Sequence, residues 1–422
     1  MRYFCQKVLR TGYSNEMEEL MSKVDEELQD INLHDKMVRI RNLKFNLMDL
    51  DAKVDPQYIS QDPRLIRLVD SIVSQYSEIQ LPMMFYLISS LWYFEMGLNE
   101  LWERICTDLK NNKIIITDSA SATKLLLFFA KNKYFDKEVL EKLEDVLFYR
   151  DDSANLVDYV HQLWAFSVLG YYNYSTRYIE QFNERALKVK DIKFHSLELS
   201  AKVLLSYSMI NKDLDNAILK KVLKAIIDSK ESEVVEEGGI SKMYPSYKQN
   251  LFHSMTVILQ SLVKLDIRNE AIFTKFANKI VCEGDESEVD YQAKEISQLF
   301  SCYVKAQFYN SLLMKKLEEK FVEKVDQALP ETLANMLLSH LDWARFIVDQ
   351  TFKENGSKEL FYKFKPYHIK FVNLLLTNLN EKGVDGWNYV SWLIIPKMSN
   401  LKHLKNRNNA RLILDVGIQG IS

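Results

Sequence analysis

The chain of 422 residues is poor in the residues that interrupt helices, with only 11 glycines and 7 prolines. Proteins rich in β-strands, and α/β proteins, need many tight turns, so this shortage argues against both classes. The four cysteines include no CxxC pair, and a disulfide framework is not expected at this length. No apolar run reaches the 18 or so residues that a membrane-spanning helix needs, so no membrane span is expected.

An excess of charge of one sign is also missing, because 55 Lys and Arg and 58 Asp and Glu give a net charge of −3. A basic field over the whole chain is therefore absent, and any nucleic-acid-binding surface must be a local stripe. The sequence has no Gly-rich phosphate-binding loop and no G-x-S-x-G motif, and none of its seven histidines belongs to an HExxH motif. These absences predict a protein that is not an enzyme and holds no cofactor or metal.

What the sequence does contain is a repeated pattern of two apolar-periodic runs with a short break between them. In LWAFSVLGYYN (163–173), bulky apolar residues surround the small Ser167, and Gly170 follows. We call the residue at the Ser167 position the anchor of its repeat. Successive anchors are 36, 37, 41, 55 and 41 residues apart, as in stacked supersecondary units. The anchors are Phe94, Ala130, Ser167, Ser208, Val263 and Val304.

Each repeat is expected to form an antiparallel helix pair, because a residue of a capping type follows the anchor by about six residues. The side-chain oxygen of Asp or Asn accepts a hydrogen bond from the first N–H groups of the second helix. Gly170 is expected to end its first helix in the left-handed conformation. The expected caps are Asp136, Asn173, Asp213 or Asp215, Asn269 and Asn310.

One helix pair cannot bury its own apolar face, so the pairs must stack. The sequence therefore predicts an all-α fold, an α-solenoid of stacked antiparallel helix pairs over 81–326. An N-terminal helical segment is expected over 1–80, where 37–48 is a helix or a strand and Asp62-Pro63 opens a helix. A C-terminal helical region is expected over 327–422, where a strand candidate at 389–395 allows a small α/β element.

The phrases LLLFFAKNKYFD (125–136) and LWAFSVLGYYN resemble the repeats of organellar RNA-binding proteins: the octotricopeptide and heptatricopeptide repeat proteins and the FAST-kinase-like group. The resemblance covers roughly 85–325. It implies a mitochondrial or plastid location and binding of RNA, often rRNA or mRNA. Residues 371–414 are similar to the small RAP domain that ends some members, on the basis of a Leu-rich helix, Gly386-Trp387 and Ile395-Pro396. The acidic residues of a nuclease-like centre cannot be placed, so nuclease activity is not implied.

The N-terminus also predicts a mitochondrial location. MRYFCQKVLRTGYS (1–14) carries Arg2, Lys7 and Arg10 among apolar residues and contains no acidic residue, which is typical of a targeting segment. An ordinary first helix is the alternative interpretation.

Lysines recur twelve and sixteen residues after the anchors, and a basic tail follows Ile395-Pro396. Residues four apart share a helix face, so stacking would align these lysines into a row that could neutralise phosphates. Ordinary solvated lysines beside nearby glutamates are the alternative. Trp92, Trp164, Tyr207 and Tyr303 offer stacking faces for bases if they are exposed. The candidate RNA-binding residues are Lys110, Lys142, Lys220, Lys224, Lys275, Lys279, Lys316, Lys320, Lys397, Lys402, Lys405, Arg407 and Arg411.

We therefore expect a non-enzymatic mitochondrial protein that binds single-stranded or ribosomal RNA, as a ribosome-associated factor or as a factor in RNA processing or stability. The alternative is a scaffold subunit of a large mitochondrial complex, a ribosome or a respiratory assembly, that works through protein–protein contacts. A cytosolic protein-binding helical adaptor is the third hypothesis. The repeat pattern and the lysines favour RNA binding, whereas the near-neutral charge favours a scaffold.

Overall fold

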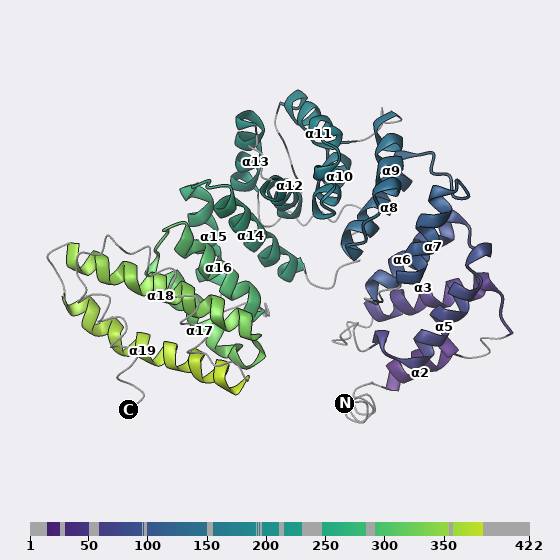
Figure 1. The fold of residues 1–422 in the computed structure, drawn as a ribbon. Coiled ribbons are helices and arrows are strands. Elements are labelled where there is room, and N and C mark those ends of the chain that lie inside the picture. Colours follow the sequence, from purple (N-terminus) through teal and green to yellow (C-terminus); the bar gives the residue numbers. More distant parts are fainter. Residues whose placement is uncertain are drawn as a thin grey trace. The chain divides into compact units, whose positions relative to one another are not determined.

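A computed structural model describes residues 15–382, apart from 26–29, 50–58, 95, 97–98, 150–154, 191, 193, 195, 211–214, 230–246, 284–291 and 354–357. Every element in this described part is a helix and none is a strand, which confirms the predicted all-α class (Figure 1). No helix there is long and apolar enough to cross a bilayer. The targeting segment at 1–14, the strand candidate at 389–395 and the RAP-like region beyond 382 lie outside the described residues.

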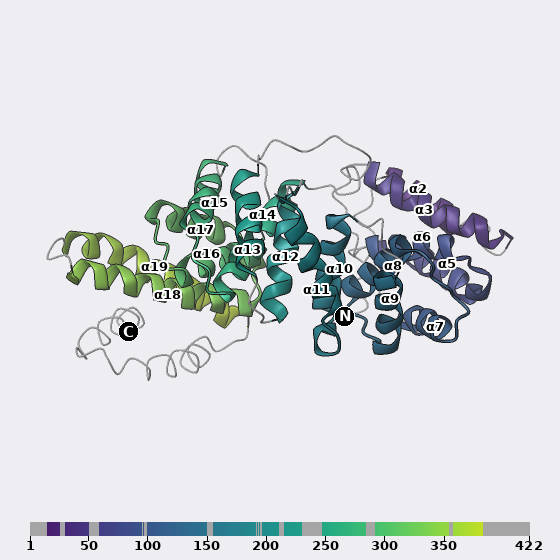
Figure 2. The same cartoon turned by 90° about the horizontal axis from the view of Figure 1, so that it is seen from above.

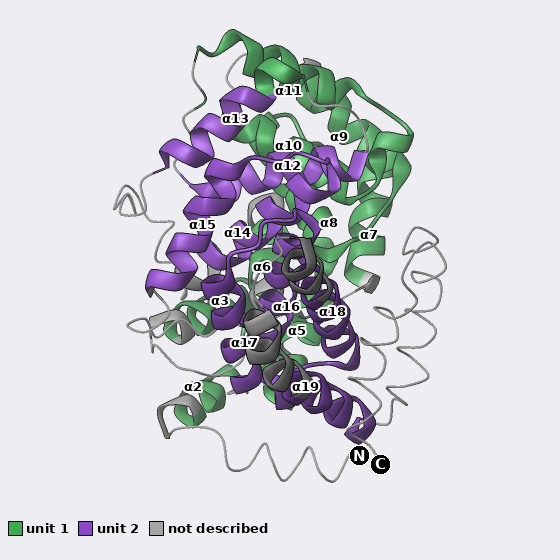
Figure 3. Cartoon of the chain, turned by 90° about the vertical axis from the view of Figure 1, so that its left-hand side faces the viewer, with its two compact units in different colours: residues 1–192, 214–218, 231–245 green, residues 193–213, 219–230, 246–422 purple. Residues whose placement is uncertain are grey.

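The chain divides into two compact units, which are described separately here (Figure 3). Unit 1 contains residues 1–192 with two short pieces at 214–218 and 231–245, and unit 2 contains 193–213, 219–230 and 246–422. Within each unit the helices are arranged as antiparallel pairs. We call the two members of a pair its first helix and its second helix.

In unit 1 the first helices form one row and the second helices form another. The first helix α8 contacts both α6 and α10, and the second helix α9 contacts both α7 and α11. This is the stacking that a solenoid requires. The pairs are α6 (Leu81–Tyr93) with α7 (Asn99–Lys110), α8 (Ser119–Asn132) with α9 (Lys137–Tyr149), and α10 (Leu156–Val168) with α11 (Arg177–Lys188).

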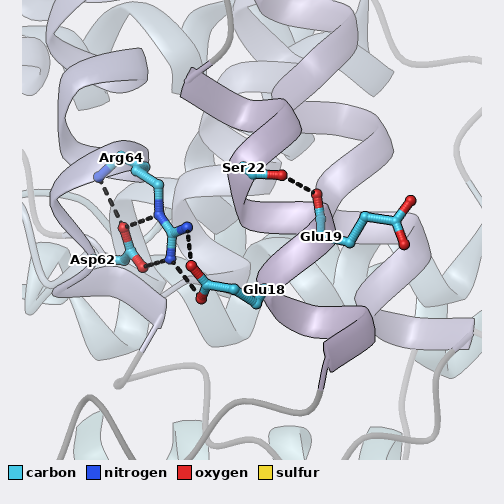
Figure 4. Close-up of polar contacts among 5 residues, drawn as sticks. All are labelled: Glu18, Glu19, Ser22, Asp62 and Arg64. Atoms are coloured by element: carbon cyan, nitrogen blue, oxygen red, sulfur yellow. Dashed lines mark hydrogen bonds and ion pairs between the residues drawn. The ribbon is translucent and has the colours of Figure 1, made fainter.

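Among the described residues, three α-helices precede these pairs: α2 (Asn15–Asp25), α3 (Leu33–Asp49) and α5 (Pro63–Ser74). The basic-apolar stretch at 37–48 is therefore helical, and Asp62 caps α5 as predicted by accepting from the Arg64 N–H. Figure 4 shows how the Arg64 guanidinium joins α5 to α2. It donates to Asp62 at 2.8 and 3.0 Å and to Glu18 at 2.7 and 3.2 Å. The hydrogen bonds to Asp62 and then to Glu18 raise the pKa of Arg64, so its guanidinium stays charged.

In unit 2 the row of first helices is α12, α14, α16 and α18, each in contact with the next (Figure 2). The second helices α15 and α17 also contact each other. Helix pairing continues past residue 326, because α18 packs against α19, and both are longer than the preceding helices. The elements are α12 (Leu197–Ile210), α13 (Asn216–Asp228), α14 (Tyr247–Lys264), α15 (Glu270–Glu283), α16 (Ala293–Lys305), α17 (Ser311–Glu323), α18 (Pro330–Lys353) and α19 (Lys358–Glu381).

Four of the six predicted anchors are followed by the same kind of backbone turn. Three residues after Ala130, Ser167, Val263 and Val304, the chain adopts a positive φ of 52–71°, and the N–H there donates to the anchor carbonyl at 3.0–3.2 Å. In three of the four turns the next N–H donates to the carbonyl just before the anchor, which completes a Schellman motif. The left-handed conformation expected for Gly170 is confirmed. The residues with positive φ are Lys133, Gly170, Asp266 and Gln307.

Most of the predicted caps are also confirmed. The side chains of Asp136, Asp215, Asn269 and Asn310 each accept from N–H groups at the start of the second helix. The prediction for Asn173 is wrong. A 3-10 turn, Tyr171–Asn173, follows Gly170 and delays the second helix until after Thr176, and the Asn173 amide donates back to the Gly170 carbonyl.

The register of the first repeat differs from the predicted one. The Met96 N–H donates to the Leu91 carbonyl at 2.9 Å, which is the bond that in the other turns joins the fourth residue after the anchor to the residue before it. The equivalent anchor is therefore Trp92, two residues earlier than Phe94. As a consequence, Lys110 is not the counterpart of Lys279.

Two buried carboxylates occupy the same repeat position, fourteen residues after their anchors. Glu144 accepts from the Tyr171 hydroxyl at 3.1 Å and from the Ser175 hydroxyl at 2.6 Å. Glu318 pairs with His340 of α18, and both side chains have no exposed surface. Burial lowers the pKa of His340 to about 3, so this histidine is neutral at physiological pH.

Candidate nucleic-acid interface

A groove of about 550 Å³ runs across three successive first helices of unit 2, α14, α16 and α18. Its volume is in the range of small-molecule sites, and it is open to solvent rather than enclosed. Most of the residues that line it are polar or charged. The side chains that bear charges or hydrogen-bonding groups are Gln260, Lys264, Lys294, Ser297, Gln298, Ser301, Lys305, Glu331, Thr332 and Asn335.

Three lysines give this groove its positive charge. Lys264, Lys294 and Lys305 are exposed, and none has an ion-pair or hydrogen-bond partner among the described residues. Glu331 is the one acidic side chain in the lining. Lys264 and Lys305 each follow their anchor directly, at the end of the first helix, so they occupy equivalent places in adjacent repeats. The groove therefore carries a local excess of positive charge in a chain that is almost neutral.

The floor of the groove is a hydrogen-bonded cluster. The buried Ser297 of α16 donates its hydroxyl to the Thr332 carbonyl of α18 at 3.2 Å. The Asn335 amide nitrogen donates to Ser297, at 2.8 Å to the hydroxyl oxygen and at 3.3 Å to the carbonyl. These bonds fix α16 and α18 relative to each other along the groove.

Two other amides in the lining are not fixed in this way. Gln260 of α14 and Gln298 of α16 are half-buried, and neither side chain has a hydrogen-bond partner in the described part of the chain. A side-chain amide can present either its oxygen or its nitrogen, so both can adapt to a polar ligand.

The second-helix lysines that were expected to contact RNA do not line this groove. The ammonium group of Lys142 donates to the carbonyls of Leu109 and Lys110, at 3.1 and 2.7 Å, and to the Asn112 side-chain oxygen at 3.1 Å. These carbonyls belong to the last turn of α7, where a helix has unpaired acceptors and a partial negative charge. Lys142 thus caps the second helix of the preceding repeat.

Lys275 does the same in unit 2. Its ammonium group donates to the carbonyls of Ile226 and Ile227, both at 3.0 Å, and to the carbonyl and hydroxyl of Ser229, at 2.7 and 3.0 Å. Lys142 and Lys275 were both expected on the basis of their place twelve residues after the anchor. For these two of the four lysines at that place, the structure shows helix capping between neighbouring repeats.

The remaining second-helix lysines differ in their partners and in their exposure to solvent. Lys110 pairs with Asp136 at 2.6 Å, Lys320 lies 3.5 Å from Glu323, and Lys279 is buried. Lys316 is half-buried, whereas Lys220 and Lys224 are exposed on α13. The basic tail lies outside the described residues: Lys397, Lys402, Lys405, Arg407 and Arg411.

Two of the four candidate aromatic side chains do not provide exposed stacking faces. Tyr207 and Tyr303 are buried, and the Tyr303 hydroxyl donates to the Phe273 carbonyl at 3.2 Å. Trp164 is half-buried, and Trp92 lies in α6. Tyr207 and Tyr303 are therefore part of the core.

Sequence reasoning missed the groove, although a signal for it exists. Lysine directly follows the anchor in three repeats, at Lys131, Lys264 and Lys305. This position is one residue past the apolar stripe of the first helix, so its side chain reaches solvent. More lysines recur at the second-helix positions, so the prediction selected those and not the three that directly follow an anchor.

Neither models of protein families nor curated proteins give a match to this chain. The assignment of a function therefore depends on the groove and on the repeat pattern.

Proposed function

We propose that this protein is a non-enzymatic, mitochondrial RNA-binding protein, and that the groove on α14, α16 and α18 holds a single-stranded segment of RNA. The observation that supports this most directly is a set of exposed lysines beside side-chain amides on successive first helices. These lysines, Lys264, Lys294 and Lys305, have no ion-pair or hydrogen-bond partner in the part of the chain that the structure describes. Lysines neutralise phosphates, and amides form hydrogen bonds with base edges. Single strands expose those edges, whereas duplex RNA hides them in a narrow groove.

The proposed role is that of a ribosome-associated factor, or of a factor in RNA processing or stability, with rRNA or mRNA as the ligand. The resemblance of the repeats to those of organellar RNA-binding proteins supports this role. The composition of residues 1–14 supports the mitochondrial location, which is tested by imaging the full chain and a variant in which Arg2, Lys7 and Arg10 are replaced by Glu. Loss of mitochondrial localisation in the variant alone is the expected result.

RNA binding is tested by fluorescence anisotropy with a labelled single-stranded RNA at several salt concentrations. The double variant Lys264→Glu, Lys305→Glu should bind more weakly, and the slope of log K against log salt should fall by about one for each lysine. The matched control is Lys220→Glu, Lys224→Glu, which makes the same charge change on exposed second-helix positions.

Three outcomes are informative. Weakening by the first-helix variant alone supports the proposed groove. Weakening by the second-helix control alone places the RNA on the other face and contradicts the groove. Absence of binding by the wild-type chain at low salt contradicts the proposed function.

A scaffold role is the second candidate, and an exposed aromatic cluster in unit 1 favours it. Phe135 and Tyr174, from the turns of neighbouring repeats, are 41% and 54% exposed, and their ring centroids are 5.6 Å apart. Phe148 is 42% exposed beneath the Arg177 guanidinium. Exposed aromatic groups of this kind are typical of protein interfaces. Sedimentation of the protein with a large mitochondrial particle after nuclease treatment, abolished by Phe135→Ser with Tyr174→Ser, would favour the scaffold over RNA binding.

A further inference from the structure

We propose that Asn335 makes the groove prefer nucleobases that carry an exocyclic amino group over uracil. This inference depends on the proposed function, because it assumes that single-stranded RNA lies in the groove. The hydrogen bonds between Asn335 and Ser297 determine which atom of the amide is left for a ligand.

The orientation of the Asn335 amide is determined by its partners. A backbone carbonyl can only accept a hydrogen bond, so the atom 3.3 Å from the Ser297 carbonyl oxygen must be the amide nitrogen. The Ser297 hydroxyl gives its own proton to the Thr332 carbonyl, which leaves the hydroxyl oxygen as an acceptor for the same nitrogen at 2.8 Å. The flipped amide would place two acceptors against each other, so one orientation alone satisfies the cluster.

The remaining polar atom of Asn335 is its side-chain oxygen. This oxygen has no partner among the described residues, and Asn335 is half-buried in the lining of the groove. The nitrogen is occupied, so Asn335 can act toward a ligand only as a hydrogen-bond acceptor. An acceptor whose rotation is blocked by buried bonds discriminates between ligands better than one that rotates freely.

The bases differ in what they offer to a lone acceptor. Cytosine and adenine present an exocyclic amino group, and guanine presents an amino group beside a ring N–H. Uracil offers a single ring N–H flanked on both sides by carbonyl oxygens, which repel the lone pairs of the Asn335 oxygen. The groove should therefore favour amino-bearing bases at this position by roughly threefold to tenfold, the contribution of one hydrogen bond.

The other two amides should not add to this preference. No described residue forms a hydrogen bond with the Gln260 or Gln298 side chain, so each can turn its oxygen or its nitrogen toward a base. Gln298→Ala is therefore the matched control for Asn335→Ala, since it removes an amide from the same groove without removing a fixed acceptor.

The test compares the affinity of the full-length protein for cytosine-rich, adenine-rich and uracil-rich single-stranded RNA of equal length. Wild-type protein and Gln298→Ala should bind the first two RNAs more tightly than the third, and Asn335→Ala should bind all three alike. A preference that is absent in wild type, or that survives in Asn335→Ala, overturns the inference while leaving RNA binding intact. If no RNA binds at all, the proposed function fails instead.

A second measurement needs only the wild-type protein and does not depend on the folding of a variant. Cytosine is replaced by its analogue that lacks the 4-amino group, in an otherwise identical RNA. The affinity should fall to that of the uracil-rich RNA. Unchanged affinity would show that the amino group is not recognised.

Discussion

The lysines of the first helices in unit 2 and the lysines at the capping position of the second helices differ in what surrounds them, although both recur with the repeat. Lys264 and Lys305 are exposed and unpaired, among the described residues, at the edge of a groove. Lys142 and Lys275 are surrounded by carbonyl oxygens of the preceding second helix. A recurrent lysine is thus an exposed residue beside a groove in one row, where we propose that RNA binds, and a helix cap in the other.

This difference has a physical origin. The end of a helix leaves its last carbonyls without intrahelical partners, and a stacked second helix places a lysine beside them. The first helices α14 and α16, which carry Lys264 and Lys305, end instead in Schellman turns, whose backbone bonds satisfy carbonyls without a side chain. Lysines there remain available. The general expectation is that polar groups between repeats determine stability, whereas polar groups in the groove determine binding.

The largest effect is expected for the most deeply buried polar pair. His340→Ala would remove the bond between His340 and the buried Glu318 and leave a cavity in the core, so it should lower the free energy of unfolding by about 3–5 kcal/mol. The double variant Glu318→Leu, His340→Leu removes both polar groups and should cost much less. Chemical denaturation of the two variants checks this, and equal losses would contradict the contribution assigned to the pair.

The same histidine should make stability depend on acid. Its pKa is about 3 in the folded state and near 6.5 when unfolded, so the unfolded chain binds the extra proton between these values. Stability should therefore fall as pH decreases from about 6.5 toward 3, by up to roughly 1.4 kcal/mol per pH unit from this group. Denaturation of wild type and of the double leucine variant across this window should give a flatter profile for the variant.

Replacement of a capping lysine should affect stability and leave RNA binding unchanged. Lys275→Met removes a charged donor from the end of α13 and should cost about 2–3 kcal/mol. Hydrogen exchange should increase first near Ile226 and Ile227. Lys220→Met, on an exposed site of the same helix, should change stability by no more than about 0.5 kcal/mol. A clear loss of RNA affinity in Lys275→Met, with the fold intact, would remove the distinction between the two rows.

Smaller changes in stability, of opposite sign, are expected at two of the turns that follow the anchors. Gly170 has a φ of 71°, and an added Cβ would come no closer than 4.0 Å to the Asn173 side chain, so Gly170→Ala should cost about 1 kcal/mol through backbone strain alone. Lys133 occupies the equivalent position with a φ of 52°, so Lys133→Gly should gain up to about 1 kcal/mol. Thermal melting of both variants tests whether the two turns are equivalent.

The smallest effect is expected at the surface. His253 of α14 is 67% exposed, and its hydrogen bond with Glu295 of α16, at 3.4 Å, raises its pKa. A raised pKa stabilises the fold at low pH, and this contribution is lost as pH rises through the folded-state value. For an exposed pair it should be below about 1 kcal/mol. NMR titration should show a lower His253 pKa in Glu295→Gln, and an unchanged value would contradict the link.

Local features of the fold were predictable from the sequence, because they depend on neighbours in the chain. Apolar periodicity identified the helix pairs, and Asp136 and Asn310 identified the starts of second helices. The prediction for Asn173 was wrong because Gly170 is followed by a 3-10 turn, Tyr171–Asn173, and not directly by the second helix. This turn places Tyr171 in the core. Phe94 misled it because an apolar residue fits the anchor position equally well two residues away from the true turn.

The candidate site was much less predictable, because its chemistry depends on contacts between repeats. The recurrence of the second-helix lysines could be read from the sequence. The carbonyls that accept hydrogen bonds from Lys275, however, lie 46–49 residues away in the sequence. The bond that orients Asn335 joins residues 38 apart. Spacing alone contains no information on such partners, since they are determined by how far one repeat is shifted against the next.

The caps formed by Lys142 and Lys275 also bear on how the protein unfolds. Each makes the end of one helix pair dependent on the presence of the following pair, which adds a nearest-neighbour coupling to the apolar contacts. Loss of a pair from the edge of a unit should therefore loosen the pair before it, so that melting proceeds inward from an edge in coupled steps. The protein should withstand local damage in a loop better than removal of a whole repeat.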